Sequence, residues 1–401
     1  MFVSLAGSQA KGKANKWLKA SCIALAISCI PMAQAQWQDP LITPSQQAAI
    51  ANKSLMLDVA QAGQRILAAG AHGHILYSDD QGLTWRQAQV PVSLTLTALY
   101  FPTAKTGWAV GHDGIVLKSS DAGATWVKQF DGYQANNEIV AGISNGKALL
   151  ETQFAAAQAK GNDAAMDELS AKIEDLEFAL EDAQADNDSG STKPFLDVWF
   201  ANEKEGFVVG AYGMFFRTQD GGKTWKNGAA SLPNPERFHI NAIARVGKNA
   251  LMMAGEQGLL LRSDDLGKTW VSLDSPYDGS FFGIAADGNN QLVFGLRGNV
   301  FRSNDGGISW TAVSLTTEQA LMSAVKLNNE VFLIGNGGSL IRFDDKLNEK
   351  AEMTIQGRKS HSSGVATSDG KIVLVGESGI IRVTAKGELL KDPIRMTGEG
   401  K

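Results

Sequence analysis

Short apolar runs separated by glycine-rich turns repeat along most of this chain. Between residues 241 and 273, the run NAIARV alternates, ALMMAG is almost continuously apolar, LLLRS follows a Gly-x-x-Gly turn, and WVSLD follows a second turn. Runs of this length and period predict four short strands, and the turns between them predict an antiparallel meander. Glycine at the turns permits backbone conformations with positive φ at little steric cost.

Two turn signals recur with this unit. The sequence Gly-x-x-Gly begins at residues 70, 111, 210, 255, 295, 335 and 376. The sequence Ser/Thr-x-Asp-x-Gly-x-Thr/Ser-Trp, an Asp-box, occupies residues 78–85, 119–126, 218–225, 263–270 and 303–310. Apart from one interval of 99 residues, the first glycines are 40–45 residues apart, which is the length of one four-stranded propeller blade. The chain is therefore predicted to be an all-β, seven-bladed β-propeller.

Each Asp-box has a structural interpretation. Its aspartate can accept hydrogen bonds from turn amides, its glycine can adopt the left-handed conformation, and its tryptophan can wedge between neighbouring blades. The aspartates are Asp80, Asp121, Asp220, Asp265 and Asp305, and the tryptophans are Trp85, Trp126, Trp225, Trp270 and Trp310. We expect these residues to brace the fold rather than to act as catalysts.

The context of the boxes resembles a known family. The segments LTALYFPTAKTGWAVGHDGIVLKSSDAGATW (96–126) and FLDVWFANEKEGFVVGAYGMFFRTQDGGKTW (195–225) are similar to the Ycf48/HCF136 family of photosystem II stability and assembly factors. The resemblance covers most of residues 37–386, apart from one insertion. It implies an exported, non-enzymatic assembly or scaffold factor whose partner is a protein client, either a membrane protein or a membrane-bound complex. It also implies a basic patch that contacts the client, whose position it does not fix residue by residue.

The insertion, residues 133–192, has a different composition from the repeats. It holds 12 acidic and three basic residues, so that the remaining propeller is neutral overall and lacks the basic groove of a nucleic-acid-binding protein. The residues Met166, Leu169, Ile173, Leu176 and Leu180 have the spacing of an amphipathic helix. A shorter helix is predicted upstream, which makes the insertion a helical hairpin over the Gly-x-x-Gly face. Its apolar seam could pack on itself, dock a partner, or pair with a second copy.

The remaining boundaries follow from this division. Residues 1–35 have a basic start, an apolar run and a small-x-small site, which predict a signal peptide; lipoprotein processing at Cys29 is the alternative. Residues 36–132 would form blades 1 and 2, with 36–43 closing blade 7 as its outer strand. Residues 193–390 would form blades 3–7, and 391–401 a C-terminal tail.

Candidate binding residues lie at two repeated positions. The Gly-x-x-Gly turns present His72, His112, Asp113, Tyr212 and Arg297. The third strands end in a basic residue at Lys118, Arg217, Arg262, Arg302, Arg342 and Arg382, of which Arg217, Arg262 and Arg302 are candidates for partner contact. The hairpin seam adds Met166, Leu169, Ile173 and Leu176.

Catalytic constellations, metal-ligand spacings and cofactor motifs are not recognisable, so we expect no catalytic residue, metal or cofactor. Two alternatives stay open. A glycoside hydrolase or sialidase-like enzyme could draw two carboxylates from distant blades into the central funnel. A passive carbohydrate- or peptide-binding propeller is the other alternative. The sequence does not indicate an oligomeric state.

Overall fold

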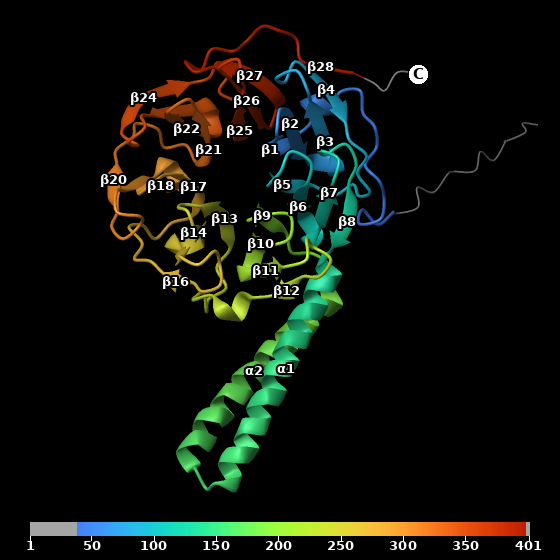
Figure 1. Ribbon diagram of the computed structural model, residues 1–401, viewed down its shortest axis with the longest axis vertical. Helices are drawn as coiled ribbons and strands as arrows, with labels where there is room; N and C mark the ends of the chain where they lie inside the picture. The colour runs from blue at the N-terminus through green and yellow to red at the C-terminus, as the bar shows by residue number, and fades with distance from the viewer. Residues whose placement is uncertain (1–37, 398–401) are drawn as a thin grey trace, which may run out of the picture. The chain divides into compact units, whose positions relative to one another are not determined.

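The computed structural model describes residues 38–397, so the predicted signal peptide, the cleavage site and Cys29 lie outside the described residues. Within that range, seven antiparallel sheets are arranged around a central axis, and two long helices form a separate feature (Figure 1). The prediction of an all-β, seven-bladed propeller with an inserted helical hairpin is confirmed.

Each blade follows the chain from its inner to its outer strand. Blade 1 contains β1 (Met56–Ala62), β2 (Arg65–Gly70), β3 (Ile75–Ser78) and β4 (Thr84–Gln87). Blade 2 contains β5 (Leu96–Tyr100), β6 (Gly107–Gly111), β7 (Val116–Ser119) and β8 (Val127–Phe130). Blade 3 contains β9 (Phe195–Phe200), β10 (Gly206–Gly210), β11 (Phe215–Thr218) and β12 (Lys226–Asn227). Blade 4 contains β13 (Ile240–Arg245), β14 (Leu251–Gly255), β15 (Leu260–Ser263) and β16 (Val271–Ser272).

The later blades repeat this order. Blade 5 contains β17 (Phe281–Asp287), β18 (Asn290–Gly295), β19 (Val300–Ser303) and β20 (Thr311–Val313). Blade 6 contains β21 (Leu321–Leu327), β22 (Glu330–Gly335), β23 (Ser339–Phe343) and β24 (Glu349–Thr354). Blade 7 contains β25 (His361–Ala366), β26 (Lys371–Gly376) and β27 (Gly379–Thr384). Short 3₁₀ turns η1–η8 lie at Ala51–Lys53, Ala71–Gly73, His112–Gly114, Ala211–Gly213, Ala229–Ser231, Glu256–Gly258, Leu296–Gly298 and Asn336–Gly338.

The hydrophobic core lies between the blades. The described residues form seven buried clusters, each shared by two adjacent blades. Between blades 7 and 1, for example, Met56, Trp85 and Val373 are completely buried in one cluster. Second strands such as β10 are buried along their whole length, because both faces of each sheet are covered. Closure of the ring therefore buries the face of every blade.

The ring closes differently from our prediction. Residues 38–43 contain no strand, and Leu41 packs in the cluster of blades 1 and 2, so the prediction that residues 36–43 complete blade 7 is wrong for the described part of that segment. The C-terminal segment takes this role instead. Leu389 forms a bridge with Val383 of β27, and β28 (Arg395–Met396) then pairs in parallel with β4 of blade 1. This segment therefore crosses the seam between the last blade and the first.

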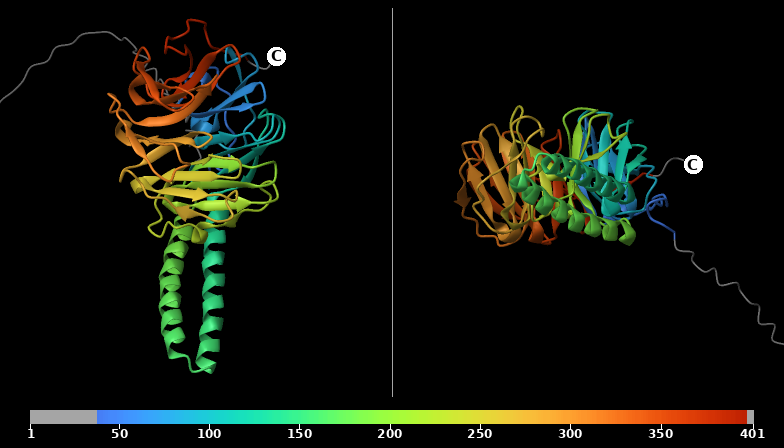
Figure 2. Two further views of the ribbon diagram at one scale, coloured as in Figure 1. Left: turned by 60° about the vertical axis from the view of Figure 1, so that its left-hand side comes forward. Right: turned by 90° about the horizontal axis from the view of Figure 1, so that it is seen from below.

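The insertion is a pair of long helices, α1 (Gly132–Ala159) and α2 (Asp163–Ser189). Asp131 caps α1 by accepting a hydrogen bond from Gln134 N at 3.1 Å, and Asn162 caps α2. Since α1 directly follows the outer strand β8 and its beginning contacts the outer strand β12, the hairpin starts at the outer edge of the ring. Figures 1 and 2 show it running outward from that edge, and not over the Gly-x-x-Gly face as we expected.

Candidate functional site

The Asp-box aspartates are fully engaged in their own turns. Asp265 accepts hydrogen bonds from Thr269 N at 2.9 Å, Thr269 Oγ1 at 2.7 Å, Ser263 Oγ at 2.8 Å and Lys268 N at 2.9 Å. Burial raises the pKa of Asp265, but these hydrogen bonds outweigh it and lower the pKa to about 2. Hydrogen bonds from the box hydroxyls and the turn amides recur at Asp80, Asp121, Asp220 and Asp305. A carboxylate held in this way is a poor proton donor.

The Asp-box tryptophans lie in the seams between blades. Each contributes to the cluster shared with the preceding blade; they are Trp85, Trp126, Trp225, Trp270 and Trp310. The indole N–H groups of Trp85 and Trp126 donate to the carbonyls of Gly82 and Gly123, both at 3.0 Å. The boxes therefore bind the ring together, and we look for partner contacts elsewhere.

Three of the six basic residues that end the third strands also link blades. Lys118 Nζ lies 4.9 Å from the ring centroid of Trp108 and donates to the carbonyl of Gly221 in the next Asp-box at 2.9 Å. Arg262 donates to the equivalent carbonyl of Gly306, and Arg302 to the side chain of Asn348 in the next blade. These contacts make Lys118, Arg262 and Arg302 ties between blades.

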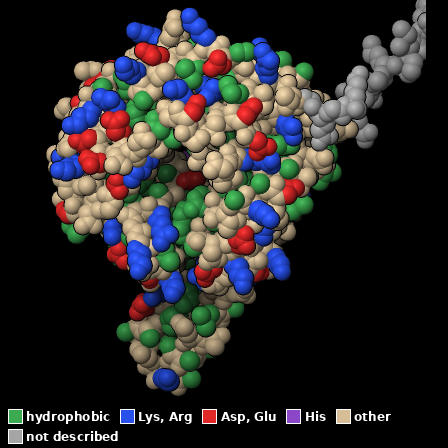
Figure 3. All heavy atoms as spheres, turned by 45° about the horizontal axis from the view of Figure 1, so that its top comes forward, with side chains coloured by type: hydrophobic (Ala, Val, Ile, Leu, Met, Phe, Trp, Pro, Cys, Tyr) green, Lys and Arg blue, Asp and Glu red, His purple; other side chains and the backbone are tan. Residues whose placement is uncertain are grey.

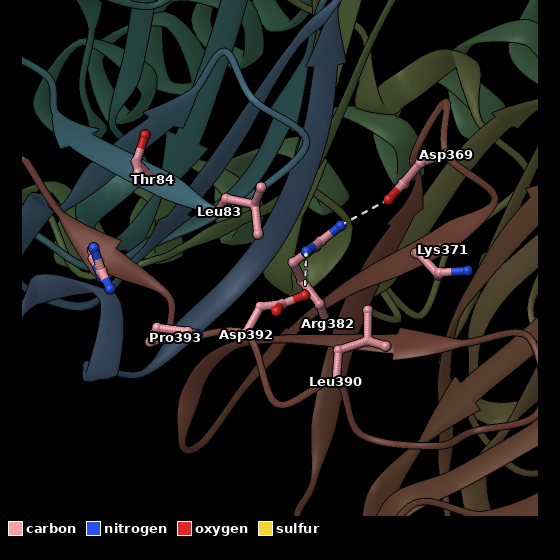
Figure 4. A pocket seen from close by; sticks show the side chains of 9 residues that line it. Leu83, Thr84, Asp369, Lys371, Arg382, Leu390, Asp392 and Pro393 are labelled. Atoms are coloured by element: carbon pink, nitrogen blue, oxygen red, sulfur yellow. Dashed lines mark hydrogen bonds and ion pairs between the residues drawn. The ribbon is translucent and has the colours of Figure 1, made fainter.

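Arg382 has different surroundings, because blade 7 meets the C-terminal segment. Its guanidinium pairs with Asp369 at 3.0 Å and lies 3.9 Å from Asp392, and its side chain is 5% exposed. These residues line a cavity of about 450 Å³ together with Leu390 and Pro393 of the C-terminal segment (Figure 4). The arginine therefore holds the closing segment against the seam.

Arg217 is the basic residue of blade 3 at this position. Within residues 38–397 its side chain makes no hydrogen bond or ion pair, and it lines a cavity of about 570 Å³ between blades 3 and 4. Arg342 lies 3.8 Å from Glu330 of its own blade. Arg217 thus differs from the other basic residues at this position.

The Gly-x-x-Gly turns form the opposite face. The third residue of these turns has left-handed backbone geometry in five of the six blades where it is not glycine: His72 (φ 60°), Asp113 (φ 54°), Tyr212 (φ 55°), Gln257 (φ 52°) and Arg297 (φ 58°). Such a conformation is costly for a residue with a side chain and is imposed here by the turn. The side chains of His72, His112, Tyr212 and Arg297 are exposed. The face thus presents a ring of variable side chains.

A network at the hairpin root connects this face to the insertion. Tyr212 is 58% exposed, and Lys193 Nζ lies 5.3 Å from its ring centroid. Lys193 also pairs with Asp186 near the end of α2. On the other side, Tyr212 packs edge-on against His239 at 4.9 Å, and His239 Nδ1 lies 3.4 Å from Glu256. A series of side-chain contacts therefore joins the end of α2 to the Gly-x-x-Gly turns of blades 3 and 4.

The blade 2 turn holds the other side of the root. Ser191 Oγ donates to the carbonyl of Asp113 at 2.5 Å, and Asn136 donates to the carbonyl of Gly190 at 3.1 Å. Tyr133 is 47% exposed at the start of α1. Together with the Tyr212 network, these contacts place two exposed tyrosines near the junction of hairpin and propeller, a residue type enriched at protein interfaces.

The predicted hairpin seam faces the partner helix. Met166, Leu169, Ile173 and Leu176 are all half-buried, and α1 and α2 pack along their length. Lys147 of α1 pairs with Glu177 of α2 at 2.8 Å. Phe178, on the outer side of α2, is 61% exposed. The apolar seam is thus used within the hairpin, and the outer surface is available for contact.

Two aspartates of the inner strands were missed by sequence reasoning. Asp58 accepts from Leu99 N of blade 2 at 2.7 Å and from Ser363 Oγ of blade 7 at 2.7 Å. Asp197 accepts from Ile243 N of blade 4 at 2.8 Å and from its neighbour Val198 N at 2.8 Å. The tripeptide Leu-Asp-Val, present at 57–59 and 196–198, was the available signal.

Both inner-strand carboxyl groups have unusual acidities. Burial raises the pKa of Asp58 to about 6, although hydrogen bonds from Leu99 and Ser363 act in the opposite direction. Burial also raises the pKa of Asp197 to about 7, and the nearby charge of Asp58 adds to this increase. Because both oxygens of each group are bonded to strands of the ring, we interpret the pair as ties between blades.

Two further features are absent from the described residues. In the stretch that the structure describes, His, Cys, Asp and Glu side chains do not gather in threes that could hold a metal ion. No helix of the described chain is both long enough and apolar enough to cross a membrane. On the face seen in Figure 3, basic and acidic side chains are interspersed around a central hollow.

The blades, the Asp-boxes and the buried tryptophans define a class of protein, the Asp-box β-propellers. Within that class, the chain belongs to the family described as photosynthesis system II assembly factor YCF48, which matches residues 5–120 and 182–318. The match is interrupted across most of the helical hairpin. The resemblance to the Ycf48/HCF136 family, inferred from residues 96–126 and 195–225, is therefore confirmed.

Curated relatives match only part of the chain. "Photosystem II assembly lipoprotein Ycf48" of Synechococcus sp. (strain CC9902) is 37% identical over 97 residues, which cover 24% of this chain and 29% of the relative. The protein of the same name from Synechococcus sp. (strain RCC307) is 44% identical over 48 residues, or 12% of this chain and 14% of the relative. The chain thus matches less than a third of either relative's length.

Solved structures extend the likeness to the whole propeller. A structure described as YCF48 bound to D1 peptide has a TM-score of 0.55 and 14% identity, covering 87% of this chain and 98% of its own. YCF48 from Cyanidioschyzon merolae has a TM-score of 0.55 and 11% identity, covering 85% and 98%. The WD40 propeller domain of Doa1, at 0.54 and 10%, covers 86% and 95%. At these identities the likeness shows the fold.

Proposed function

We propose that this protein is an exported, non-enzymatic assembly factor that holds a client polypeptide through its Gly-x-x-Gly face and its acidic hairpin. The client would be a membrane protein or a membrane-bound complex. Membership of the Ycf48 family supports the assembly role, and the related YCF48 bound to D1 peptide supports a polypeptide client. The curated relatives are named lipoproteins, which supports export.

The observation that carries the proposal is the Tyr212 network. In this network, the half-exposed ring of Tyr212 lies on the Gly-x-x-Gly face and is connected through Lys193 to the end of α2. Exposed tyrosines at a rigid junction supply contact area with little loss of side-chain freedom. A client that touches both the face and the hairpin would bury this ring.

The hairpin supplies a second, electrostatic contribution. Residues 133–192 hold 12 acidic residues against three lysines, and five of the acids on the outer side of α2, Asp167, Glu174, Asp175, Glu181 and Asp182, are exposed and form no ion pair with described residues. Charge of one sign accelerates encounter with a partner of opposite charge. We propose a client with a basic surface segment. Because the family match is interrupted here, this contribution would be particular to this chain and its close kin.

A catalytic role in the central channel is not proposed. Asp58 and Asp197 use both carboxyl oxygens in hydrogen bonds to the inner strands. A glycosidase needs one such group to deliver a proton and the other to attack or activate water. The bonded arrangement favours a mechanical role over such chemistry.

The test is affinity purification of the exported protein from its own membranes, followed by identification of the recovered partners. Three variants are compared with the native chain: residues 133–190 replaced by a short Gly-Ser linker, Tyr212→Ala, and Ile308→Ala as the matched control. Ile308 is 76% exposed on the Asp-box face, so its loss should leave the partners unchanged.

We expect the linker variant and Tyr212→Ala each to recover at least tenfold less client than the native chain. Recovery of the same partners in the same amounts by both variants would contradict the proposed binding surface. A native chain that recovers no membrane protein would contradict the assembly role itself. Melting temperatures of all variants separate loss of contact from loss of fold.

A further inference from the structure

Blade 3 carries a row of three side chains that faces blade 4. Trp199 of β9, Phe207 of β10 and Arg217 of β11 lie directly opposite one another across the three strands. Residues opposite one another on adjacent strands point to the same face of the sheet. The two rings are stacked, with centroids 6.1 Å apart and planes inclined by 16°, and both belong to the cluster shared by blades 3 and 4. Arg217 therefore extends this aromatic pair toward the outer strand.

At three other seams, a basic residue in such a row is bonded to the next blade. Its acceptor is the carbonyl that follows the Asp-box aspartate: Lys118 donates to Gly221 O at 2.9 Å, and Arg262 donates to Gly306 O. In blade 1, where Tyr77 takes the position, Arg65 lies over the tyrosine ring and donates to Ala122 O at 3.2 Å. At three seams, a guanidinium or ammonium group thus occupies the same position between the blades.

The seam between blades 3 and 4 lacks this bond. The equivalent carbonyl belongs to Leu266, whose side chain packs on the cluster of Trp199 and Phe207. No described residue accepts a hydrogen bond from the Arg217 side chain. A leucine at this box position fills space that alanine or glycine leaves open at the three bonded boxes, those of blades 2, 3 and 5. The result is a guanidinium without an acceptor beside a cavity of about 570 Å³.

Three acidic side chains also line this cavity. Asp264 is paired with Arg262 at 2.7 Å, Asp265 is bonded within its box, and Glu205 accepts from Asn202 at 3.0 Å. Lys268 also lines the cavity, and its ammonium has no partner among the described residues. Each of these acids thus has a partner, whereas the Arg217 and Lys268 side chains have none among the described residues.

We propose that this seam binds the carboxylate of a ligand that carries a flat or apolar group. The planar guanidinium fork of Arg217 matches a carboxylate, and the adjoining aromatic pair of Trp199 and Phe207 supplies an apolar wall. The cavity volume lies within the range of small-molecule sites, roughly 300–1,000 Å³. The site lies at the Asp-box face, so it goes beyond the proposed client-binding surface and stands independently of it.

The carboxylate could come from a free organic acid or from a polypeptide. Phenylacetate is the probe for the first source, with phenylacetamide as its uncharged counterpart. Acetyl-Ala-Ala-Phe with a free carboxyl end is the probe for the second, with the same peptide amidated. Titration calorimetry and ligand-observed NMR on the exported chain give the dissociation constants, and tighter binding of one acid identifies the source.

Three variants locate the binding. Arg217→Gln should weaken binding of the acids at least tenfold, and Arg217→Lys should restore part of it because the charge is kept. Arg302→Gln removes an equivalent arginine that is bonded to Asn348, so it should lower the melting temperature without changing acid binding. Since Arg217 has no protein acceptor in the described chain, Arg217→Gln should leave the melting temperature within about one degree.

The outcomes separate clearly. Acid binding that is lost in Arg217→Gln and kept in Arg302→Gln supports the site, whichever probe binds more tightly. Equal binding of the amides and the acids would overturn it, because the carboxylate would then make no contribution. Unchanged binding in Arg217→Gln would also overturn it. The absence of saturable binding by either acid at a concentration of about 20 mM would do the same.

Discussion

The ring of blades and the helical hairpin are held together in different ways. Every seam of the ring has a buried cluster, and Lys118, Arg262, Asp58 and Asp197 add hydrogen bonds from one blade to the next. The buried residues of the hairpin are few, and α2 contributes Ala183 alone. The ring is neutral overall, while the hairpin carries an excess of nine acidic groups. Stability and charge therefore reside in separate parts, which can be altered independently.

The largest expected effect comes from opening a seam of the ring. Trp85 is completely buried between blades 7 and 1 and bonded to Gly82, so Trp85→Ala should lower the free energy of unfolding by about 4 kcal/mol. Leu176→Ala, in the hairpin, should change the ring transition by less than about 0.5 kcal/mol. The hairpin contains no tryptophan, so urea titrations followed by tryptophan fluorescence report on the ring. Equal loss in both variants would show that ring and hairpin unfold as one unit.

Removal of the closing segment should have the next largest effect. Ile394 and Met396 pack on the cluster of blades 7 and 1, and Arg395 N and Thr397 N donate to the carbonyls of Leu83 and Trp85 at 3.1 and 2.8 Å. A chain that ends at Pro393 should lose about 2 kcal/mol, because two half-buried apolar side chains and two hydrogen bonds disappear. The same fluorescence titration measures it. An unchanged midpoint would mean that the ring closes through blade contacts alone.

A smaller effect depends on pH. The pKa of Asp197 is about 7 in the folded chain and about 3.9 in an unfolded one, so the folded state binds the additional proton between these values. Stability from this group therefore increases as pH falls through 7 and is lost as pH rises. Relative to Asp197→Asn, the native chain should lose about 2 kcal/mol between pH 5 and 8, a figure reduced for solvent screening because the Asp197 side chain is only half-buried.

The comparison with Asp197→Asn removes the contribution of the buried histidines. Burial lowers the pKa of His361 and of His74, and this acts in the opposite direction, since stability from a histidine kept neutral is lost at acid pH. Both histidines are present in the two chains and cancel in the difference. Asp345→Asn, at an exposed position, is the control and should follow the native chain, because it keeps Asp197. Parallel curves for the native chain and Asp197→Asn would refute the buried-carboxylate explanation.

The smallest expected effect on stability is in the hairpin. Replacement of Asp167, Glu174, Asp175, Glu181 and Asp182 by their amides should change the ring transition by less than about 0.5 kcal/mol, because exposed charges contribute little. Recovery of the membrane client should nevertheless fall severalfold. A change in the ring transition of more than 1 kcal/mol would show that the charges also act on the fold.

Local signals predicted the blades because each turn has its own chemistry. The Gly-x-x-Gly turn and the Asp-box both place a glycine at positive φ, as at Gly73 and Gly82, so the spacing of glycines marked the strands. The second helix was predicted from the spacing of Met166 to Leu180. The first helix was predicted too short, since Gly142 and Gly146 weaken its intrinsic propensity and packing on α2 stabilises it.

Features that depend on ring geometry were not predictable in this way. The closing strand was placed at the wrong end of the chain because β28 has two residues and therefore no periodicity. Asp58 and Asp197 have a role only once a neighbouring blade presents an amide, and Lys193 and His239 join the candidate site only through Tyr212. Arg217 was selected with Arg262 and Arg302, and their difference lies in what the next blade offers.

The Gly-x-x-Gly turns have a consequence for protein engineering. A Cβ at Gly111 would lie 2.3 Å from the carbonyl oxygen of Thr95, and one at Gly255 would lie 2.1 Å from that of His239, so these glycines fix the turn. The third residue of the turn has left-handed geometry in five blades, where it is histidine, aspartate, tyrosine, glutamine or arginine. Side chains can therefore be exchanged at this position in each of the five blades without a new backbone design. The propeller can therefore serve as a scaffold whose binding surface is changed by substitutions in single blades.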